Sequence, residues 1–408
     1  MMIEGEKKIN SRRKTRQVYC GDVLIGGGAP VSVQSMTNTD TRDVPATVRQ
    51  IASLAEVGCD IVRCAVPDES AANALANIKV ELNRRGILIP IVADIHFDYR
   101  LAIAAIESGA DKIRINPGNI GDDDRVRAVV DCAKDAGIPI RIGVNGGSLE
   151  RDIAAHHGGA TAEALCESAL RNADRVGSMG FEDIVISVKS SDVRTGIETL
   201  RLLSERTDFP LHIGVTEAGA GERALMKSAI GIGSLLADGI GDTIRVSLTG
   251  DPVREIYAAR GILASLGILP GAIDVISCPT CGRCKVDLPR IVAEVQTAVN
   301  EIENDRIKAA RGKIYAQRRN RDSALDKDSV VTDVMSGGAA RENRFAHKAF
   351  TVAVMGCAVN GPGEAAGADI GVACGDGNAV LFENGVKVKS LNDGEIVQEL
   401  IKRISDMP

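Results

Sequence analysis

The chain has 408 residues, of which 44% are hydrophobic and 25% are charged, so it can bury one large core and has room for a second. A net charge of −6, 2% aromatic residues and no Trp argue against a nucleic-acid binder with stacking platforms. No apolar run approaches the roughly 20 residues of a membrane span, and no apolar segment follows the charged N-terminus. We therefore expect a cytoplasmic protein.

One pattern recurs from about residue 30 to residue 250. A short β-branched run is followed by a polar loop and then by an Ala/Leu/Glu-rich segment of helical period. The predicted strands are residues 31–37, 60–66, 89–97, 111–117, 138–144, 183–191, 211–217 and 242–249. Strands that alternate with helices pair in parallel, and eight such units favour a closed (β/α)8 barrel of the TIM type over an open sheet.

The sequence changes character after a helix predicted over residues 251–267. A smaller α+β region follows, with strands predicted at residues 271–280, 350–359, 368–374 and 378–388. Between them, residues 305–347 are charged and contain few large apolar residues, which predicts an inserted, mobile excursion. We therefore expect a barrel domain over residues 1–268 and a second domain over residues 269–408.

Polar residues occupy the C-terminal ends of the predicted barrel strands, where side chains point into the mouth of the barrel. They are Gln34, Ser35, Arg63, Asp94, His96, Arg114, Asn116, Arg141, Asn145, Lys189, Glu217, Arg245 and Ser247. Four arginines and a lysine predict an anion site, because guanidinium groups match pairs of phosphate oxygens. Any one of them suits a core ion pair as well, but so many buried cations need an anionic partner, and diphosphate is the natural candidate.

Among these strand-end residues, Asp94 and Glu217 are the carboxylates, so they are the candidates for proton transfer or for hydroxyl recognition. His96 suits a packing role equally well. His212 lies early in its strand, which favours packing for that residue.

Four cysteines form the other candidate site. Cys278, Cys281 and Cys284 follow the pattern C-x2-C-x2-C, and Cys357 lies in a Gly/Pro-rich loop after a predicted strand. Two such loops that meet in space can hold zinc or an iron–sulfur cluster, and the spacing does not decide between them. The remaining cysteines have no ligand spacing and are interpreted as small core residues: Cys20, Cys59, Cys64, Cys132, Cys166 and Cys374.

Several long motifs resemble those of the 4-hydroxy-3-methylbut-2-enyl diphosphate synthase family, and the resemblance covers nearly the whole chain. They are VQSMTNTDT, VADIHFDYR, RINPGNIG, RIGVNGGSLE, TEAG, GIGDTIRVSL, CPTCGR and GCAVNGPGEA. The resemblance implies a barrel that binds 2-C-methyl-D-erythritol 2,4-cyclodiphosphate and a small C-terminal domain that carries a [4Fe-4S] cluster. The cluster ligands that it implies are Cys278, Cys281, Cys357 and Glu364. Cys284 is then a bystander, and a cluster of four thiolates stays the competing interpretation.

The reaction that the resemblance implies is reductive ring opening and dehydroxylation to (E)-4-hydroxy-3-methylbut-2-enyl diphosphate, in the methylerythritol phosphate route to isoprenoids. Side chains cannot supply single electrons, so this oxidoreductase needs a cluster and a reduced flavodoxin or ferredoxin as donor. We expect Glu217 to donate a proton and Glu364 to be the exchangeable cluster ligand. The residues expected to bind substrate are Arg63, Asp94, Arg114, Arg141, Asn145, Lys189 and Ser247.

Two other functions fit parts of the pattern. One is a barrel enzyme that acts on another phosphorylated substrate and carries a structural zinc. The other is an iron–sulfur electron carrier, which the strand-end cations disfavour.

Chain direction predicts the assembly. The helix after the eighth strand has about 16 residues and covers roughly 24 Å, so it returns the chain to the opposite face of the barrel. We therefore expect a head-to-tail homodimer in which each cluster domain caps the barrel of the partner.

Overall fold

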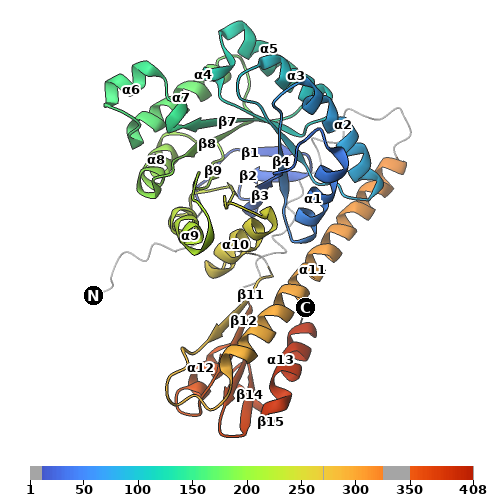
Figure 1. Cartoon of the computed structure of the whole chain (residues 1–408), viewed down its shortest axis with the longest axis vertical. Helices are drawn as coiled ribbons and strands as arrows, with labels where there is room; N and C mark the ends of the chain where they lie inside the picture. The colour runs from blue at the N-terminus through green and yellow to red at the C-terminus, as the bar shows by residue number, and fades with distance from the viewer. Residues whose placement is uncertain (1–11, 270, 325–349, 408) are drawn as a thin grey trace. The chain divides into compact units, whose positions relative to one another are not determined.

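The computed structural model describes residues 12–269, 271–324 and 350–407, with the side chains of residue 308 and of residues 310–324 left aside. The chain divides into two compact units, Met1–Leu266 and Gly267–Pro408. Figure 1 colours the first unit from blue to yellow and the second from orange to red.

Eight parallel strands form the centre of the first unit, and helices surround them (Figure 1). The strands are β3 (Ser32–Met36), β4 (Ile61–Ala65), β5 (Ile91–Asp94), β6 (Lys112–Ile115), β7 (Ile140–Asn145), β8 (Ile184–Lys189), β9 (His212–Ile213) and β10 (Thr243–Ile244). Their order in the sheet is β8-β7-β6-β5-β4-β3-β10-β9, and a bridge between Ile186 and Leu211 joins the two ends. The predicted TIM-type barrel is confirmed.

Each barrel strand is followed by a helix of the outer ring. These helices are α1 (Val44–Glu56), α2 (Glu69–Arg84), α3 (Tyr99–Glu107), α5 (Asp123–Asp135), α7 (Ala162–Gly177), α8 (Val193–Arg206), α9 (Gly221–Ala237) and α10 (Pro252–Ser265). An aspartate precedes six of them, and its carboxylate accepts a backbone N–H of the first turn: Asp43, Asp68, Asp98, Asp122, Asp192 and Asp251. Such caps fix where each loop ends and each helix begins.

Three short helical segments lie in the loops at the C-terminal ends of the strands. They are α4 (Pro117–Ile120), η1 (Gly146–Ser148) and α6 (Arg151–His157).

A hairpin that the sequence analysis missed packs against the inside of the barrel. It consists of β1 (Gln17–Cys20) and β2 (Val23–Gly26), which pair antiparallel. Val18, Cys20 and Ile25 form one buried cluster with the barrel residues Ile61, Val92 and Val185. Apolar side chains thus fill the lower part of the barrel, which leaves its polar interior facing the other end.

The second unit contains a five-stranded sheet in the order β11-β12-β13-β14-β15. The strands are β11 (Ile273–Ser277), β12 (Phe350–Met355), β13 (Ile370–Cys374), β14 (Asn378–Glu383) and β15 (Val386–Asn392). The single strand predicted over residues 378–388 is therefore wrong, because Asn384 and Gly385 form a two-residue turn there. Both have positive φ, 48° and 81°, as such hairpin turns require.

Helices cover this sheet, and the last part of the long α11 lies in the region that we predicted to be a mobile excursion. Its bounds are Leu288–Ala324, and two other helices are α12 (Gly361–Gly367) and α13 (Ile396–Ser405), with η2 (Asp393–Glu395) before the latter. Residues 305–324 belong to α11, so this part of the predicted excursion is helical. Residues 325–347 lie outside the described residues. The division between Leu266 and Gly267 falls two residues before the domain boundary that we predicted.

Candidate active site

The carboxylate of Asp94 is the centre of an ion-pair cluster at the end of β5. Its Oδ2 lies 3.8 Å from Arg63 Nε and 3.4 Å from His96 Nε2, and its Oδ1 accepts a hydrogen bond from Arg114 Nη1 at 3.4 Å. Burial by itself would raise the pKa of Asp94, but Arg63, His96 and Arg114 together hold it well below its usual value. These ion pairs hold Asp94 as an anion that orients Arg63 and Arg114.

The barrel interior around this cluster has an excess of positive charge. Five cations there are buried, and Arg245 is nearly so: Arg63, Lys112, Arg114, Arg141, Lys189 and Arg245. The buried carboxylates against them are Asp94 and Glu255. Two guanidinium nitrogens of Arg141, Nε and Nη1, have no hydrogen-bond partner among the described residues. Uncompensated buried cations of this kind predict an anionic ligand.

The electrostatic cost of burying these cations appears in their pKa values. Burial, reinforced by the charges of Arg63 and Arg114, lowers the pKa of Arg141. Burial, reinforced by Arg245 and Arg63, likewise lowers the pKa of Lys189 well below its usual value. An anion bound among them would offset both effects, because it favours the charged forms.

Two glycines make room for these side chains. A Cβ on Gly143, in β7, would lie 2.3 Å from Arg114 Nε. A Cβ on Gly214, after β9, would lie 2.4 Å from the carbonyl oxygen of Arg245 and 3.6 Å from Lys189 Nζ. The strand-end cations therefore depend on the absence of a side chain on the neighbouring strand.

A cavity of about 610 Å³ opens above the cluster. It is lined by Arg114, Asn145, Lys189 and Glu217, four residues that the sequence predicted to act together. It is also lined by residues that were not in the predicted site, among them Phe97, Asn119, Ser148 and Thr216. Arg63, Asp94 and Arg141 lie among the same interior charges, whereas Ser247 is half-buried after β10 and does not line this cavity.

Glu217 has an unusual backbone conformation. Its φ is +52°, in the left-handed region that residues with a side chain rarely adopt, and the residue is exposed at the cavity. A non-glycine residue in this region stores strain, and strain of this kind concentrates at functional sites. The backbone thus supports a functional role for this carboxylate.

The second predicted site lies on two loops of the second unit. Strands β11 and β12 are parallel neighbours, with Ser277 opposite Val354. Cys278 therefore follows the end of one strand, and Cys357 follows the end of the next, on the same edge of the sheet. Thr280, between Cys278 and Cys281, has a φ of +51°, which is a strained conformation for a β-branched residue.

Backbone N–H groups point at the three predicted thiolates. Cys278 Sγ accepts the N–H of Gly356 at 3.3 Å. Hydrogen bonds from the backbone N–H groups of Asn360, Val359 and Gly361 lower the pKa of Cys357. Hydrogen bonds from the backbone and the side chain of Arg283 lower the pKa of Cys281. Cys281 also lies close enough to Cys357 for the two thiolates to repel each other. Such N–H···S bonds are typical of sulfur ligands in metal and cluster sites.

Cys284 is placed differently. Its Sγ donates a hydrogen bond to the carbonyl of Val286 at 3.3 Å. A Cβ on Gly356 would lie 2.5 Å from this sulfur, and Cys284, like Cys278, packs against the apolar core of the unit. These contacts support the bystander interpretation.

Glu364 lies in the first turn of α12, the helix whose first N–H group faces Cys357, and its side chain is exposed. Within the described ranges, no three His, Cys, Asp or Glu side chains are close enough to hold a metal ion. The donor chemistry of the three thiols fits an iron–sulfur cluster nonetheless, because Cys278 Sγ accepts a backbone N–H and hydrogen bonds lower the pKa of Cys281 and Cys357.

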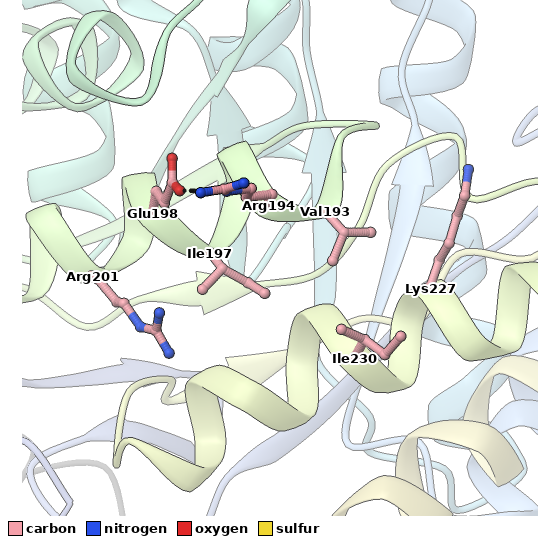
Figure 2. Close-up of a pocket in the computed structure, with 7 residues that line it drawn as sticks. All are labelled: Val193, Arg194, Ile197, Glu198, Arg201, Lys227 and Ile230. Carbon is pink, nitrogen blue, oxygen red and sulfur yellow. Dashed lines mark hydrogen bonds and ion pairs between the residues drawn. The ribbon is translucent and has the colours of Figure 1, made fainter.

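Another hollow, of about 460 Å³, lies on the outer wall of the barrel between α8 and α9 (Figure 2). Val193, Ile197 and Ile230 contribute its apolar surface. Arg194 bonds Glu198 at 3.0 Å, as the dashed line in Figure 2 marks, and Arg201 bonds Asp238 at 2.8 Å. Because its arginines are already paired with carboxylates, it is a weaker anion site than the barrel mouth.

Comparison with known proteins decides the family. Residues 15–260 match the family described as the GcpE TIM-barrel domain, and residues 329–406 match the GcpE protein C-terminal domain. The chain belongs to the GcpE family. The resemblance inferred from the sequence motifs is thereby confirmed.

Similar proteins with curated names extend over the whole chain. One from Caldanaerobacter subterraneus is 49% identical over 98% of this chain and 99% of its own length. Another from Ruminiclostridium cellulolyticum is 48% identical over 97% of this chain and 98% of its own length. Both are named 4-hydroxy-3-methylbut-2-en-1-yl diphosphate synthase (flavodoxin).

Among solved structures, a dihydropteroate synthase from Xanthomonas albilineans has a TM-score of 0.43 at 16% identity and covers 61% of this chain and 98% of its own. We draw nothing about function from this likeness. Within the described residues of this GcpE-family chain, no helix is long and apolar enough to cross a membrane.

Proposed function

We propose that this GcpE-family chain reduces 2-C-methyl-D-erythritol 2,4-cyclodiphosphate to (E)-4-hydroxy-3-methylbut-2-enyl diphosphate. The observation that carries the proposal is the excess of buried cations at the barrel mouth, which exceeds what Asp94 and Glu255 can neutralise. A cyclic diphosphate supplies the missing negative charge. The names of the relatives contain the product of the proposed reaction, 4-hydroxy-3-methylbut-2-en-1-yl diphosphate.

The substrate-binding roles follow from burial and geometry. Arg114 and Lys189 line the cavity and would contact the phosphate oxygens from its floor. Arg63, Arg141 and Ser247 would complete the diphosphate site. Asp94 holds Arg63 and Arg114 in place through its two oxygens.

Asn145 and Glu217 would bind the hydroxyl side of the substrate, because they line the same cavity as Lys189. Overall, the reaction consumes two electrons and two protons, opens the ring at its tertiary carbon and releases the neighbouring hydroxyl as water. We assign the proton that leaves with that hydroxyl to Glu217, because it is exposed at the cavity while Asp94 is locked in ion pairs.

Cys278, Cys281, Cys357 and Glu364 would hold a [4Fe-4S] cluster, which supplies the single electrons that side chains cannot. Hydrogen bonds lower the pKa of Cys281 and Cys357, which favours the thiolate form that iron requires. Cys278 Sγ accepts the backbone N–H of Gly356. Flavodoxin, which the names of the relatives contain, is the electron donor that we propose. All ten cysteines are unpaired, and we place the reaction in the cytoplasm, where thiols stay reduced.

Anaerobic purification followed by metal analysis and phosphorus NMR tests this proposal. The protein should contain iron and sulfide, show a visible absorption that dithionite bleaches, and convert the cyclodiphosphate to the linear diphosphate with reduced viologen. A colourless protein that contains zinc would favour the alternative enzyme on another phosphorylated substrate.

A further inference from the structure

Glu255 is a buried carboxylate to which the text above gives no role beyond offsetting part of the cation excess. It lies in the first turn of α10, and 3% of it is exposed. Its Oε2 accepts a hydrogen bond from Ser35 Oγ at 2.7 Å, and its Oε1 accepts the backbone N–H of Leu248 at 3.0 Å. Oε1 also lies 3.6 Å from Arg245 Nη2. Both oxygens are therefore occupied by groups from β3 and from the segment after β10.

These contacts lie at the point where the barrel ladder ends. Strand β10 pairs with β3 only through Thr243 with Ser32 and Ile244 with Val33. Beyond Ile244 the chain continues as residues 245–249 without a partner in β3, although this stretch carries Arg245 and Ser247. Glu255 bridges the gap, because it joins Ser35 of β3 to Leu248 of this segment.

The same carboxylate offsets a repulsion inside the mouth. Burial and the nearby charge of Arg63 lower the pKa of Arg245, and Glu255 acts in the opposite direction. Without Glu255, Arg245 would be free to turn away from Arg63, because like charges in a desolvated site repel strongly. The N–H of Leu248 would lose its acceptor at the residue next to Ser247.

We propose that Glu255 is a positioning residue for the substrate-binding mouth: it fixes Arg245 and Ser247 against the bound diphosphate without touching the substrate. The inference rests on the proposed function, since it names what orders the diphosphate site. It assigns a specific task to the first turn of α10, a helix that otherwise serves the outer ring of the barrel.

Calorimetric binding of inorganic pyrophosphate tests the role directly. Glu255→Gln and Glu255→Ala should weaken the affinity by about tenfold or more, with the larger loss in the alanine variant, because glutamine still has an oxygen that can accept the N–H of Leu248. Removal of a negative charge would by itself tighten anion binding. A weaker affinity therefore reports lost position, and an unchanged or tighter affinity in both folded variants overturns the inference.

A double-mutant cycle separates positioning from general stability. If Glu255 acts through Arg245, Glu255→Gln should cost much less affinity in an Arg245→Ala background than in the wild type. Additive losses would contradict the inference. Glu163→Gln is the matched control, because Glu163 lies exposed in the first turn of α7, and this variant should bind pyrophosphate as the wild type does.

Turnover distinguishes failure of this inference from failure of the proposed function. In the loaded enzyme, the Glu255 variants should raise KM for the cyclodiphosphate more than they lower kcat, with unchanged iron content and visible spectrum. A wild type that binds pyrophosphate but does not convert the cyclodiphosphate would refute the proposed function, and the pyrophosphate measurements would still decide the role of Glu255.

Discussion

Lys112 lies at the start of β6 and is fully buried, with the thiol of Cys20 as a polar neighbour. Burial lowers its pKa from 10.5 to about 8, and the nearby Cys20 only partly opposes this shift. The unfolded chain therefore binds more protons than the folded chain between about pH 8 and the usual lysine value. The stability of the wild type should rise with pH across this window.

Lys112→Met should remove this penalty. At pH 7 we expect the free energy of unfolding to increase by up to about 3 kcal/mol, and the gain should vanish above about pH 10.5. Urea unfolding of the wild type and of Lys112→Met, at pH 7 and above about pH 10.5, measures this gain. Lys134→Met is the control, because Lys134 is an exposed lysine in α5. A gain that is equal at both pH values would mean that the methionine improves packing and that the charge is not the cause.

Cys281 and Cys284 offer a direct comparison of ligand and bystander. Cys284→Ser should keep the iron content and the visible absorption of the wild type, because Cys284 Sγ is already engaged by the carbonyl of Val286. Cys281→Ser should lose the cluster, since Cys281 is an exposed thiol with a lowered pKa. Iron analysis and the visible spectrum decide, and a colourless Cys284→Ser protein would make Cys284 a ligand.

Gly143 of β7 leaves room at the barrel mouth for the side chain of Arg114, because it has no side chain of its own. Gly143→Ala would place a methyl group 2.3 Å from Arg114 Nε, so the guanidinium must move away from Asp94. We expect pyrophosphate affinity to fall by about tenfold or more while the cluster spectrum stays the same. Gly233→Ala in α9, where a Cβ meets nothing within 4 Å, should leave both unchanged. Wild-type affinity in folded Gly143→Ala protein would show that Arg114 does not hold the anion in this position.

The elements that the sequence predicted well are those with a strong local pattern. The strands around Arg63, Arg114 and Arg141 are apolar runs followed by polar loops, and all of them form. The strands predicted over residues 211–217 and 242–249 form ladders of only two residues, because their later parts leave the sheet. Of these later parts, Thr216 and Glu217 line the cavity. The Asn-Gly pair at residues 384 and 385 is a strong signal for a hairpin turn, and our prediction overlooked it.

The site residues at the ends of strands could be predicted from the sequence, and the site residues elsewhere could not. Parallel pairing places every strand end at one mouth, so Arg114, Asn145, Lys189 and Glu217 could be grouped from spacing alone. Glu255 could not, because nothing in a helical period says which first-turn residue faces the mouth. Neither could the room that Gly143 leaves for Arg114, since it depends on the register of β6 and β7.

At the scale of the whole molecule, we propose a head-to-tail homodimer in which each active site combines the barrel of one chain with the cluster loops of the other. The argument is chain direction: α10 follows the last barrel strand and runs back along the barrel before the second unit begins at Gly267. A short linker then favours sites built between two chains over sites within one.

Mixing two inactive variants tests the assembly. Arg114→Ala has a damaged barrel and intact cluster loops, and Cys278→Ser has the reverse. If sites form between chains, a mixed dimer has one site with both lesions and one intact site, so activity should return on subunit exchange. Sites formed within each chain would each keep one lesion, and the mixture would stay inactive.

The electron count of the reaction tests the central claim most directly. The chain with its cluster restored should convert 2-C-methyl-D-erythritol 2,4-cyclodiphosphate under anaerobic conditions while it oxidises reduced flavodoxin. We predict two electrons consumed for each molecule of (E)-4-hydroxy-3-methylbut-2-enyl diphosphate formed. Phosphate-ester hydrolysis without flavodoxin oxidation, or no turnover by protein with a full cluster, would contradict the account.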